Sequence, residues 1–168
     1  MIDVDIMQDA SEIVHYDIMG TPIYIRKGLL SLYPDMRALC HWHEDIELMY
    51  IIKGQAYVTC EQDNILANEG DIVFINQSIR HFITPTNPEG CIFRSIIVHP
   101  SFIFGFGQLE MEKKYITPVI HDASIKYLHI TPESSCYHAF QPHILEIITQ
   151  NDEKPAGYEL ISKAAILY

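Results

Sequence analysis

The chain has 168 residues and a formal net charge of −11 at pH 7, with 48% hydrophobic and 20% charged residues. This length suits a single domain with a sizeable core, and the composition excludes a disordered chain. An acidic surface repels phosphate, which argues against nucleic acid or an anionic membrane as a direct partner. No apolar run approaches the roughly 20 residues that span a bilayer. The acidic N-terminus lacks the basic start of a signal peptide, so a cytoplasmic protein is expected.

Most of the chain between residues 12 and 100 is predicted to form short β-strands. The candidate strands are rich in Ile, Val, Tyr and Phe and comprise residues 23–27, 36–43, 46–52, 55–60, 71–75, 81–84 and 91–99. They recur at roughly the 8–12-residue interval of a sandwich or barrel, with turn signals such as Lys53-Gly54 between them. No helical stripe of useful length interrupts them, which argues against a parallel βαβ sheet.

The pattern changes after residue 100. A short helix is expected over residues 108–115, one more strand over 125–130, and a helix from Pro142 to about Gln150, because proline suits the first helical turn. After a turn at 151–155, a last helix carries an apolar stripe formed by Leu160, Ile161, Ala164 and Leu167. Whether this stripe packs on the barrel or on a second subunit stays open. The last helix has no stop signal, so we expect the natural chain to continue past residue 168.

The segment Cys-His-Trp-His-Glu-Asp-Ile-Glu, residues 40–47, is the richest in chemistry. Side chains alternate along a strand, so His41 and His43 would share one face, and Glu47 would open the next strand beside them. Arg37 would continue the same face and point into the interior. Two imidazoles and a carboxylate are therefore expected to converge inside the barrel.

The spacing His-x-His-x3-Glu-x6-Gly in this region resembles the first cupin motif at each of its defining positions, which are His41, His43, Glu47 and Gly54. The second cupin motif is only partly matched, by Gly70 and His81. Asn76 and Ser78 replace its proline and glycine, and Pro85 replaces its asparagine.

In metal-binding cupins the matching positions hold a divalent ion, and here they are His41, His43, Glu47 and His81. Fe(II), Mn, Ni, Cu and Zn all suit such a ligand set. In the other interpretation, the same side chains line a cavity and hydrogen-bond a small organic ligand or water without any metal.

A longer stretch, HWHEDIELMYIIKGQAYVTC followed by LANEGDIVFINQSIRH, is similar to the N-terminal domain of AraC-type transcription regulators. The similarity runs from about Tyr24 to the end of the chain. It implies a mainly β fold, a cupin-like double-stranded β-helix (jelly-roll barrel) followed by a C-terminal helical hairpin. It also implies a small effector, often a sugar, a homodimer, and a helix-turn-helix DNA-binding domain after residue 168.

The resemblance divides the chain into an N-terminal arm at 1–20 that folds over the effector, a barrel at 21–132 and dimerisation helices at 133–168. Barrels of these regulators commonly keep the histidine and glutamate pattern without using a metal, so no cofactor and no catalysis are expected. DNA would be reached only through the following domain. The effector-binding candidates are Arg37, His41, His43, Glu47 and His81, and the dimer candidates are Leu160, Ile161, Ala164 and Leu167.

Two other functions stay open. In the first, the chain is a stand-alone metal-dependent cupin enzyme of the dioxygenase or isomerase type, with its metal held by His41, His43, Glu47 and His81. In the second, it is a binding module without a DNA partner.

Three further features lead to structural expectations. Arg94 lies within a strand, and an internal salt bridge is favoured for it over an effector carboxylate. Trp42 is expected to point away from the interior and to pack against the helical hairpin. The four cysteines, Cys40, Cys60, Cys91 and Cys136, form no CxxC pair, and we expect reduced and mostly buried thiols.

Overall fold

The computed structural model describes residues 5–16, 20–104 and 110–168. Residues 1–4 and 17–19 of the expected N-terminal arm lie outside these ranges, as do residues 108–109 of the expected helix at 108–115.

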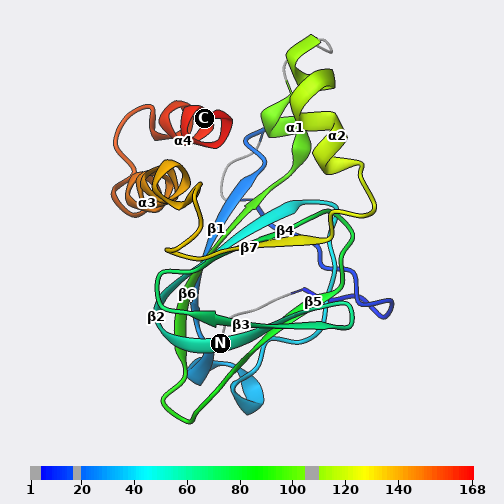
Figure 1. Ribbon diagram of the computed structural model, residues 1–168, viewed down its shortest axis with the longest axis vertical. Coiled ribbons are helices and arrows are strands. Elements are labelled where there is room, and N and C mark those ends of the chain that lie inside the picture. The colour runs from blue at the N-terminus through cyan, green and yellow to red at the C-terminus, as the bar shows by residue number, and fades with distance from the viewer. Residues whose placement is uncertain (1–4, 17–19, 105–109) are drawn as a thin grey trace.

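Antiparallel strands form the body of the molecule (Figure 1). The strands are β1 (Ile23–Leu29), β2 (Ile46–Cys60), β3 (Asp63–Asn68), β4 (Ile72–Ile75), β5 (His81–Pro85), β6 (Cys91–Val98) and β7 (Tyr127–Ile130). The first half of β2 pairs with β6 and β4, and β1 and β7 extend this layer as β1-β6-β2-β4-β7. The second half of β2 pairs with β3 and β5 in the opposite layer. The long β2 therefore joins the two layers of a jelly-roll.

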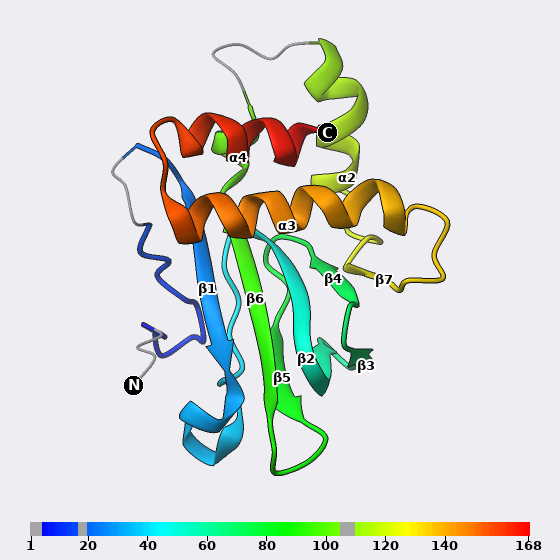
Figure 2. The same ribbon diagram turned by 90° about the vertical axis from the view of Figure 1, so that its left-hand side faces the viewer.

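Helices cover the outer face of the larger layer (Figure 2). The helical elements are η1 (Leu30–Leu32), η2 (Pro34–Met36), α1 (Pro100–Ile103), the π-helical turn η3 (Glu112–Ile116), α2 (Thr117–Ile120), α3 (Tyr137–Glu153) and α4 (Tyr158–Leu167). The long α3 lies across this layer, and α4 packs against α3. Among the described residues, no helix has the length and apolarity that a membrane crossing requires.

Alternation along β2 separates two apolar cores. Leu48 and Tyr50 belong to the cluster between the sheet and the helices, to which α3 contributes Ile147. Met49 and Ile51 belong to the cluster inside the barrel. Both faces of this strand are covered, which explains why its sequence is almost continuously apolar. The expected mainly β, cupin-like fold with a C-terminal pair of packed helices is confirmed.

Three expectations about single elements are wrong. No strand forms over 36–43, since η2 ends at Met36 and residues 37–40 are irregular. Lys53-Gly54 is no hairpin turn, because β2 continues through it with a register shift in its pairing to β6, and Gly54 takes the positive φ of +83°. Such an irregularity bends a strand without ending it. Conversely, the apparent turn residues 62–64 and 68–70 overlap the two ends of a strand, β3, that the sequence did not reveal.

The helix expected to begin at Pro142 begins five residues earlier, at Tyr137, so that Pro142 lies inside α3. Proline inside a helix removes one backbone hydrogen bond. Burial of Tyr137 and Ile144 compensates for this loss, and the Tyr137 hydroxyl donates a hydrogen bond of 2.8 Å to the Gly70 carbonyl.

Candidate functional site

A buried cluster inside the barrel brings together four side chains that the sequence singled out. His41 precedes β2 and pairs with His81 at the start of β5 through two backbone hydrogen bonds of 2.9 and 3.1 Å. His43 follows two residues later, and Glu47 lies on β2. Each of these residues is at most 3% exposed, and one side-chain nitrogen or oxygen from each lies within 4.8 Å of the others. The expected convergence is confirmed, although the strand thought to carry His41 and His43 does not form.

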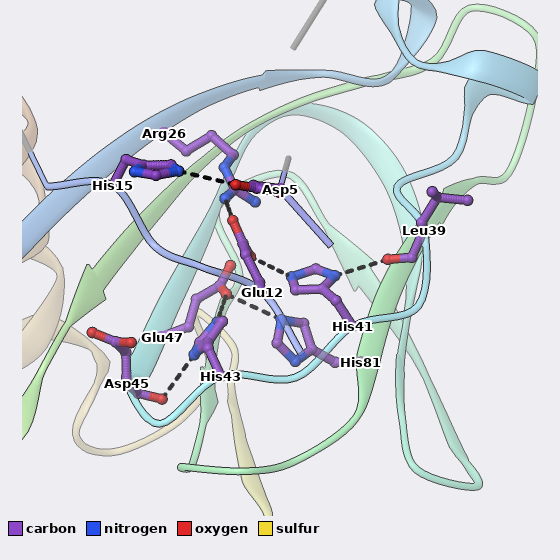
Figure 3. A network of polar contacts seen from close by, with 10 residues as sticks. All are labelled: Asp5, Glu12, His15, Arg26, Leu39, His41, His43, Asp45, Glu47 and His81. Atoms are coloured by element: carbon purple, nitrogen blue, oxygen red, sulfur yellow. Dashed lines mark hydrogen bonds and ion pairs between the residues drawn. The ribbon is translucent and has the colours of Figure 1, made fainter. Parts of the chain in front are cut away.

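The backbone orients the three imidazoles, and Figure 3 shows the contacts of His41 and His43. The Nδ1 atom of His41 donates to the Leu39 carbonyl at 2.8 Å, that of His81 to the Ile79 carbonyl at 2.8 Å, and that of His43 to the Asp45 carbonyl at 3.0 Å. A carbonyl oxygen only accepts, so each Nδ1 carries a proton. Each Nε2 is thereby left to face the centre of the cluster, as in histidines that bind a metal or a ligand.

Glu47 is the acidic centre of the cluster. Its Oε2 atom lies 3.2 Å from His43 Nε2 and 3.1 Å from His81 Nε2. Burial by itself would raise the pKa of Glu47, but the hydrogen bonds from the two histidines outweigh burial and hold that pKa well below its usual value. Burial would likewise lower the pKa of His43, and the contact with Glu47 raises it instead. The cluster is therefore a charged site in the barrel interior.

A second carboxylate, which the sequence did not reveal, reaches the same cluster from the N-terminal segment, residues 5–16. Glu12 is 9% exposed and forms an ion pair with Arg26, which β1 directs into the barrel (Figure 3). Its other oxygen, Oε2, lies 3.1 Å from His41 Nε2, although these two atoms make no well-aligned hydrogen bond. Burial would raise the pKa of Glu12, and the contacts with His41 and Arg26 lower it. No motif marks either Glu12 or Arg26 in the sequence.

Backbone contacts with residue 42 hold the N-terminal segment against the barrel. The Glu12 amide donates to the Trp42 carbonyl at 2.8 Å, and the Trp42 amide donates to the Ala10 carbonyl at 3.0 Å. The Trp42 indole nitrogen donates to the Asp9 carbonyl at 3.2 Å. Trp42 thus contacts the N-terminal segment, and the expectation that it packs against the helical hairpin is wrong. Farther along, the Tyr16 hydroxyl donates to the Asp45 carboxylate at 2.5 Å.

The space left inside the barrel is small. A cavity of about 10 Å³ lies between Arg26, His41, Glu47 and His81, which is room for about one water molecule. Tyr33 and Ser95 also line it, and neither of their hydroxyls has a hydrogen-bond partner among the described residues.

The predicted position of Arg37 is wrong, whereas the predicted salt bridge of Arg94 forms. Arg37 is exposed and lies near the Phe82 ring, because residues 37–40 form no strand that would direct it inward, so its predicted place in the interior is wrong. Arg94 forms the predicted internal salt bridge, at 2.6 Å from Asp152 on α3.

The predicted dimer stripe lies on the surface of α4. Leu160, Ile161 and Leu167 are 75%, 41% and 51% exposed, and Ala164 is exposed as well. The opposite side of α4 packs on the apolar core through Ala165 and Ile166. Packing of the stripe on the barrel is therefore excluded.

The chain is similar to one protein family, to two curated proteins and to solved structures. A family model described as the AraC-like ligand binding domain matches residues 33–167. Two uncharacterised HTH-type transcriptional regulators of Bacillus subtilis (strain 168) are similar to the chain. YdeC is 24% identical over 123 residues, which are 73% of this chain and 41% of that protein. YbfI is 27% identical over 116 residues, with shares of 64% and 40%.

The chain thus spans about two fifths of the length of these curated relatives. Among solved structures, a Cupin 2 conserved barrel domain protein from Salinispora arenicola CNS-205 is similar at 15% identity and a TM-score of 0.44, over 53% of this chain and 73% of that one.

Proposed function

Because the chain belongs to the AraC-like ligand-binding domain family, we propose that it is the effector-sensing and dimerisation domain of a cytoplasmic bacterial transcription regulator. The observation that carries this proposal is the buried cluster of His41, His43, Glu47 and His81 around a small internal cavity. Burying several titratable groups costs free energy that an apolar core would avoid, so such groups point to a binding site.

In this proposal the effector is a small polar molecule, such as a sugar, that contacts the cluster inside the barrel. Residues 1–20 act as an arm over the site, residues 21–132 as the barrel and residues 133–168 as the dimerisation helices. Support comes from the segment containing Glu12, which lies against His41 in the described part of this arm. In this proposal the chain senses its effector and does not catalyse a reaction.

The outer face of β2 connects the site to the helices. Glu47 points into the barrel, while its neighbour Leu48 packs in the core under α3. An effector that changes the position of β2 or of the arm would therefore shift the equilibrium between arrangements of α3 and α4. Both curated relatives are named as HTH-type regulators, which supports a DNA-binding domain that follows residue 168.

The exposed stripe of α4 is the proposed dimer contact. Replacing Leu160 by Asp places a charge in the middle of this apolar surface, and we expect the protein to sediment as a monomer where the unmodified chain sediments as a dimer. Leu66 on β3 is a matched control, since it is also exposed and apolar, and Leu66→Asp is expected to leave the dimer intact. A monomeric unmodified chain, or a dimeric Leu160→Asp protein, would contradict this contact.

The proposed regulator function is tested by the coding sequence beyond residue 168. We expect it to encode a basic domain with helix-turn-helix units. A reading frame that stops directly after Tyr168 would refute the proposal.

The same cluster supports a second candidate, a metal-dependent cupin enzyme. The donor set fits a divalent ion, because one nitrogen or oxygen atom of His41, His43, His81 and Glu47 each lies within 4.8 Å of the others, while the backbone holds each histidine Nδ1. The buried His41 Nε2 also lacks a hydrogen-bond partner among the described residues. A bound ion would supply a Lewis acid with an open coordination position.

Elemental analysis of protein purified without chelator tests this candidate. A stoichiometric metal that is lost when His41 and His43 are both changed to Ala would support it. A metal content far below stoichiometric, or one unchanged in that variant, would exclude it.

A further inference from the structure

We propose that the place of the Glu12 carboxylate, between Arg26 and His41, is a carboxylate-binding subsite, and that the effector carries a carboxylate that takes the place of Glu12. This inference rests on the proposed function, since it names the chemical class of the molecule that the barrel senses.

Arg26 provides the first argument. It lies on β1, is only 6% exposed, and forms an ion pair with Glu12 inside the barrel. A buried ion pair contributes little to stability compared with apolar residues of similar size, so its presence suggests a purpose beyond folding. The planar guanidinium matches a carboxylate better than it matches a neutral group, because it can donate two parallel hydrogen bonds.

The size of the cavity provides the second argument. At about 10 Å³ it holds no organic molecule while Glu12 is in place. Glu12 belongs to a segment that meets His41 and Trp42 from outside the barrel sheet, so it can withdraw without breaking a strand. Its withdrawal would break the ion pair of Arg26 and leave the buried guanidinium with Glu47 nearby but no paired carboxylate, which is unfavourable. A ligand that enters must therefore bring an anionic group of its own to Arg26.

The other residues that line the cavity limit which chemical groups the ligand can carry beside its carboxylate. Tyr33 and Ser95 line the same cavity and are 8% and 1% exposed, and their hydroxyls have no hydrogen-bond partner among the described residues. They suit hydroxyl or carbonyl oxygens close to the carboxylate. The Glu47 carboxylate lines the same cavity, and placing a dianion such as phosphate beside a second acidic group is unfavourable. A small hydroxy or keto monocarboxylate fits these groups best.

Chemical rescue tests the subsite with acetate as the probe. Glu12→Ala removes the resident carboxylate and leaves space beside Arg26, so we expect a lowered melting temperature that acetate restores in a saturable way. Acetate should bind this variant at least tenfold more tightly than it binds the unmodified chain. Acetamide, which has the same shape without the charge, should have no such effect. Adding Arg26→Gln to Glu12→Ala should abolish the response, whereas Glu110→Ala, which removes an exposed carboxylate, should show none.

A second variant covers the case in which Glu12→Ala does not fold. Glu12→Gln keeps the volume and removes the charge, and acetate should displace this amide from Arg26. Trp42 is the single tryptophan of the chain and bonds the segment that carries residue 12, so its fluorescence should change in a saturable way with acetate but not with acetamide. A folded variant that responds to neither probe, or equally to both, would overturn the proposal.

Failure of this inference is distinguishable from failure of the proposed function. If acetate has no effect but the Leu160-dependent dimer and the downstream DNA-binding domain are found, the ligand class alone is wrong. If acetate rescues Glu12→Ala but no DNA-binding domain follows, the subsite stands and the regulator function falls.

Discussion

Three backbone carbonyls determine which ring nitrogen of each barrel histidine carries a proton and which one faces the cluster. Because each carbonyl fixes a proton on Nδ1, the Nε2 atoms of His41, His43 and His81 all face Glu47 and Glu12. Two buried carboxylates and a buried arginine then compensate one another. Such a network is stabilising only while it is complete, and removal of one member leaves charges unpaired.

Glu47→Ala tests this dependence. The variant leaves His43 and His81 without their shared acceptor, and we expect the free energy of unfolding to fall by roughly 3–5 kcal/mol. The exposed Glu110 is the control, since its contact with Lys113 is a surface ion pair and Glu110→Ala should cost less than about 1 kcal/mol. Urea denaturation measures both changes. A loss below about 1 kcal/mol for Glu47→Ala would show that the cluster does not act as a unit.

The cysteines give a second prediction for single residues. All four thiols are unpaired in the structure, with Cys40 and Cys136 exposed and Cys60 and Cys91 buried, so the expected burial holds for only half of them. Burial raises the pKa of Cys60 to about 12 and that of Cys91 to about 11, which suppresses the reactive thiolate.

A thiol reagent applied to the folded protein should therefore modify Cys40 and Cys136 rapidly, and Cys60 and Cys91 only after unfolding. Peptide mapping by mass spectrometry identifies the modified sites. Equal labelling rates at all four positions would contradict the burial of the two inner thiols.

Residue spacing predicted the histidine and Glu47 part of the site, but it could not predict the ion pair of Glu12 and Arg26. His41, His43 and Glu47 stand close together in the sequence in a motif with fixed spacing, so their convergence could be inferred. Glu12 and Arg26 meet only because the N-terminal segment folds back onto the barrel, and no local pattern encodes that contact. The inward direction assigned to Arg37 depended on a strand that does not form.

At the scale of elements, close packing between β1 and β6 depends on a glycine. A Cβ atom on Gly28 would lie 2.1 Å from the Phe93 ring, which fills the barrel interior from β6. Gly28→Ala therefore forces the ring to move, and we expect it to lower the free energy of unfolding by about 1–3 kcal/mol.

Combining Gly28→Ala with Phe93→Leu tests whether the clash with the Phe93 ring causes the loss of stability. The smaller side chain makes room for the added methyl group, so the double variant should be more stable than the sum of the two single effects predicts. Denaturant unfolding of all four proteins gives this coupling. Simple additivity would mean that the ring is not the obstacle.

Alternation of apolar residues located most strands, because each strand buries side chains on at least one face. It failed where local signals and tertiary contacts disagree. Gly54 suggested a turn inside a strand that bends and continues, and Pro142 suggested a helix start inside a helix that begins with the buried Tyr137. In both cases, packing against the sheet outweighs the local preference.

For the molecule as a whole, the inner and outer faces of the larger layer contact different groups. The inner face of the β1-β6-β2 layer borders the charged cluster, and its outer face supports α3 and α4 (Figure 2). The exposed apolar stripe lies on α4. The net charge of −11 fits the proposed function, in which an acidic sensing domain would not compete with a following basic domain for DNA phosphates.

In the proposed function, the barrel interior is a ligand site that the N-terminal segment closes. Native-state hydrogen exchange tests this closure by comparing the amides of Glu12 and Trp42 with that of Ile51, which bonds the Asp71 carbonyl in the core. We predict that Glu12 and Trp42 exchange through a local opening whose free energy is at least roughly 2 kcal/mol below that of Ile51. Exchange of all three amides with the same free energy and the same denaturant dependence would contradict the proposed closure, because the segment would then open only when the whole domain unfolds.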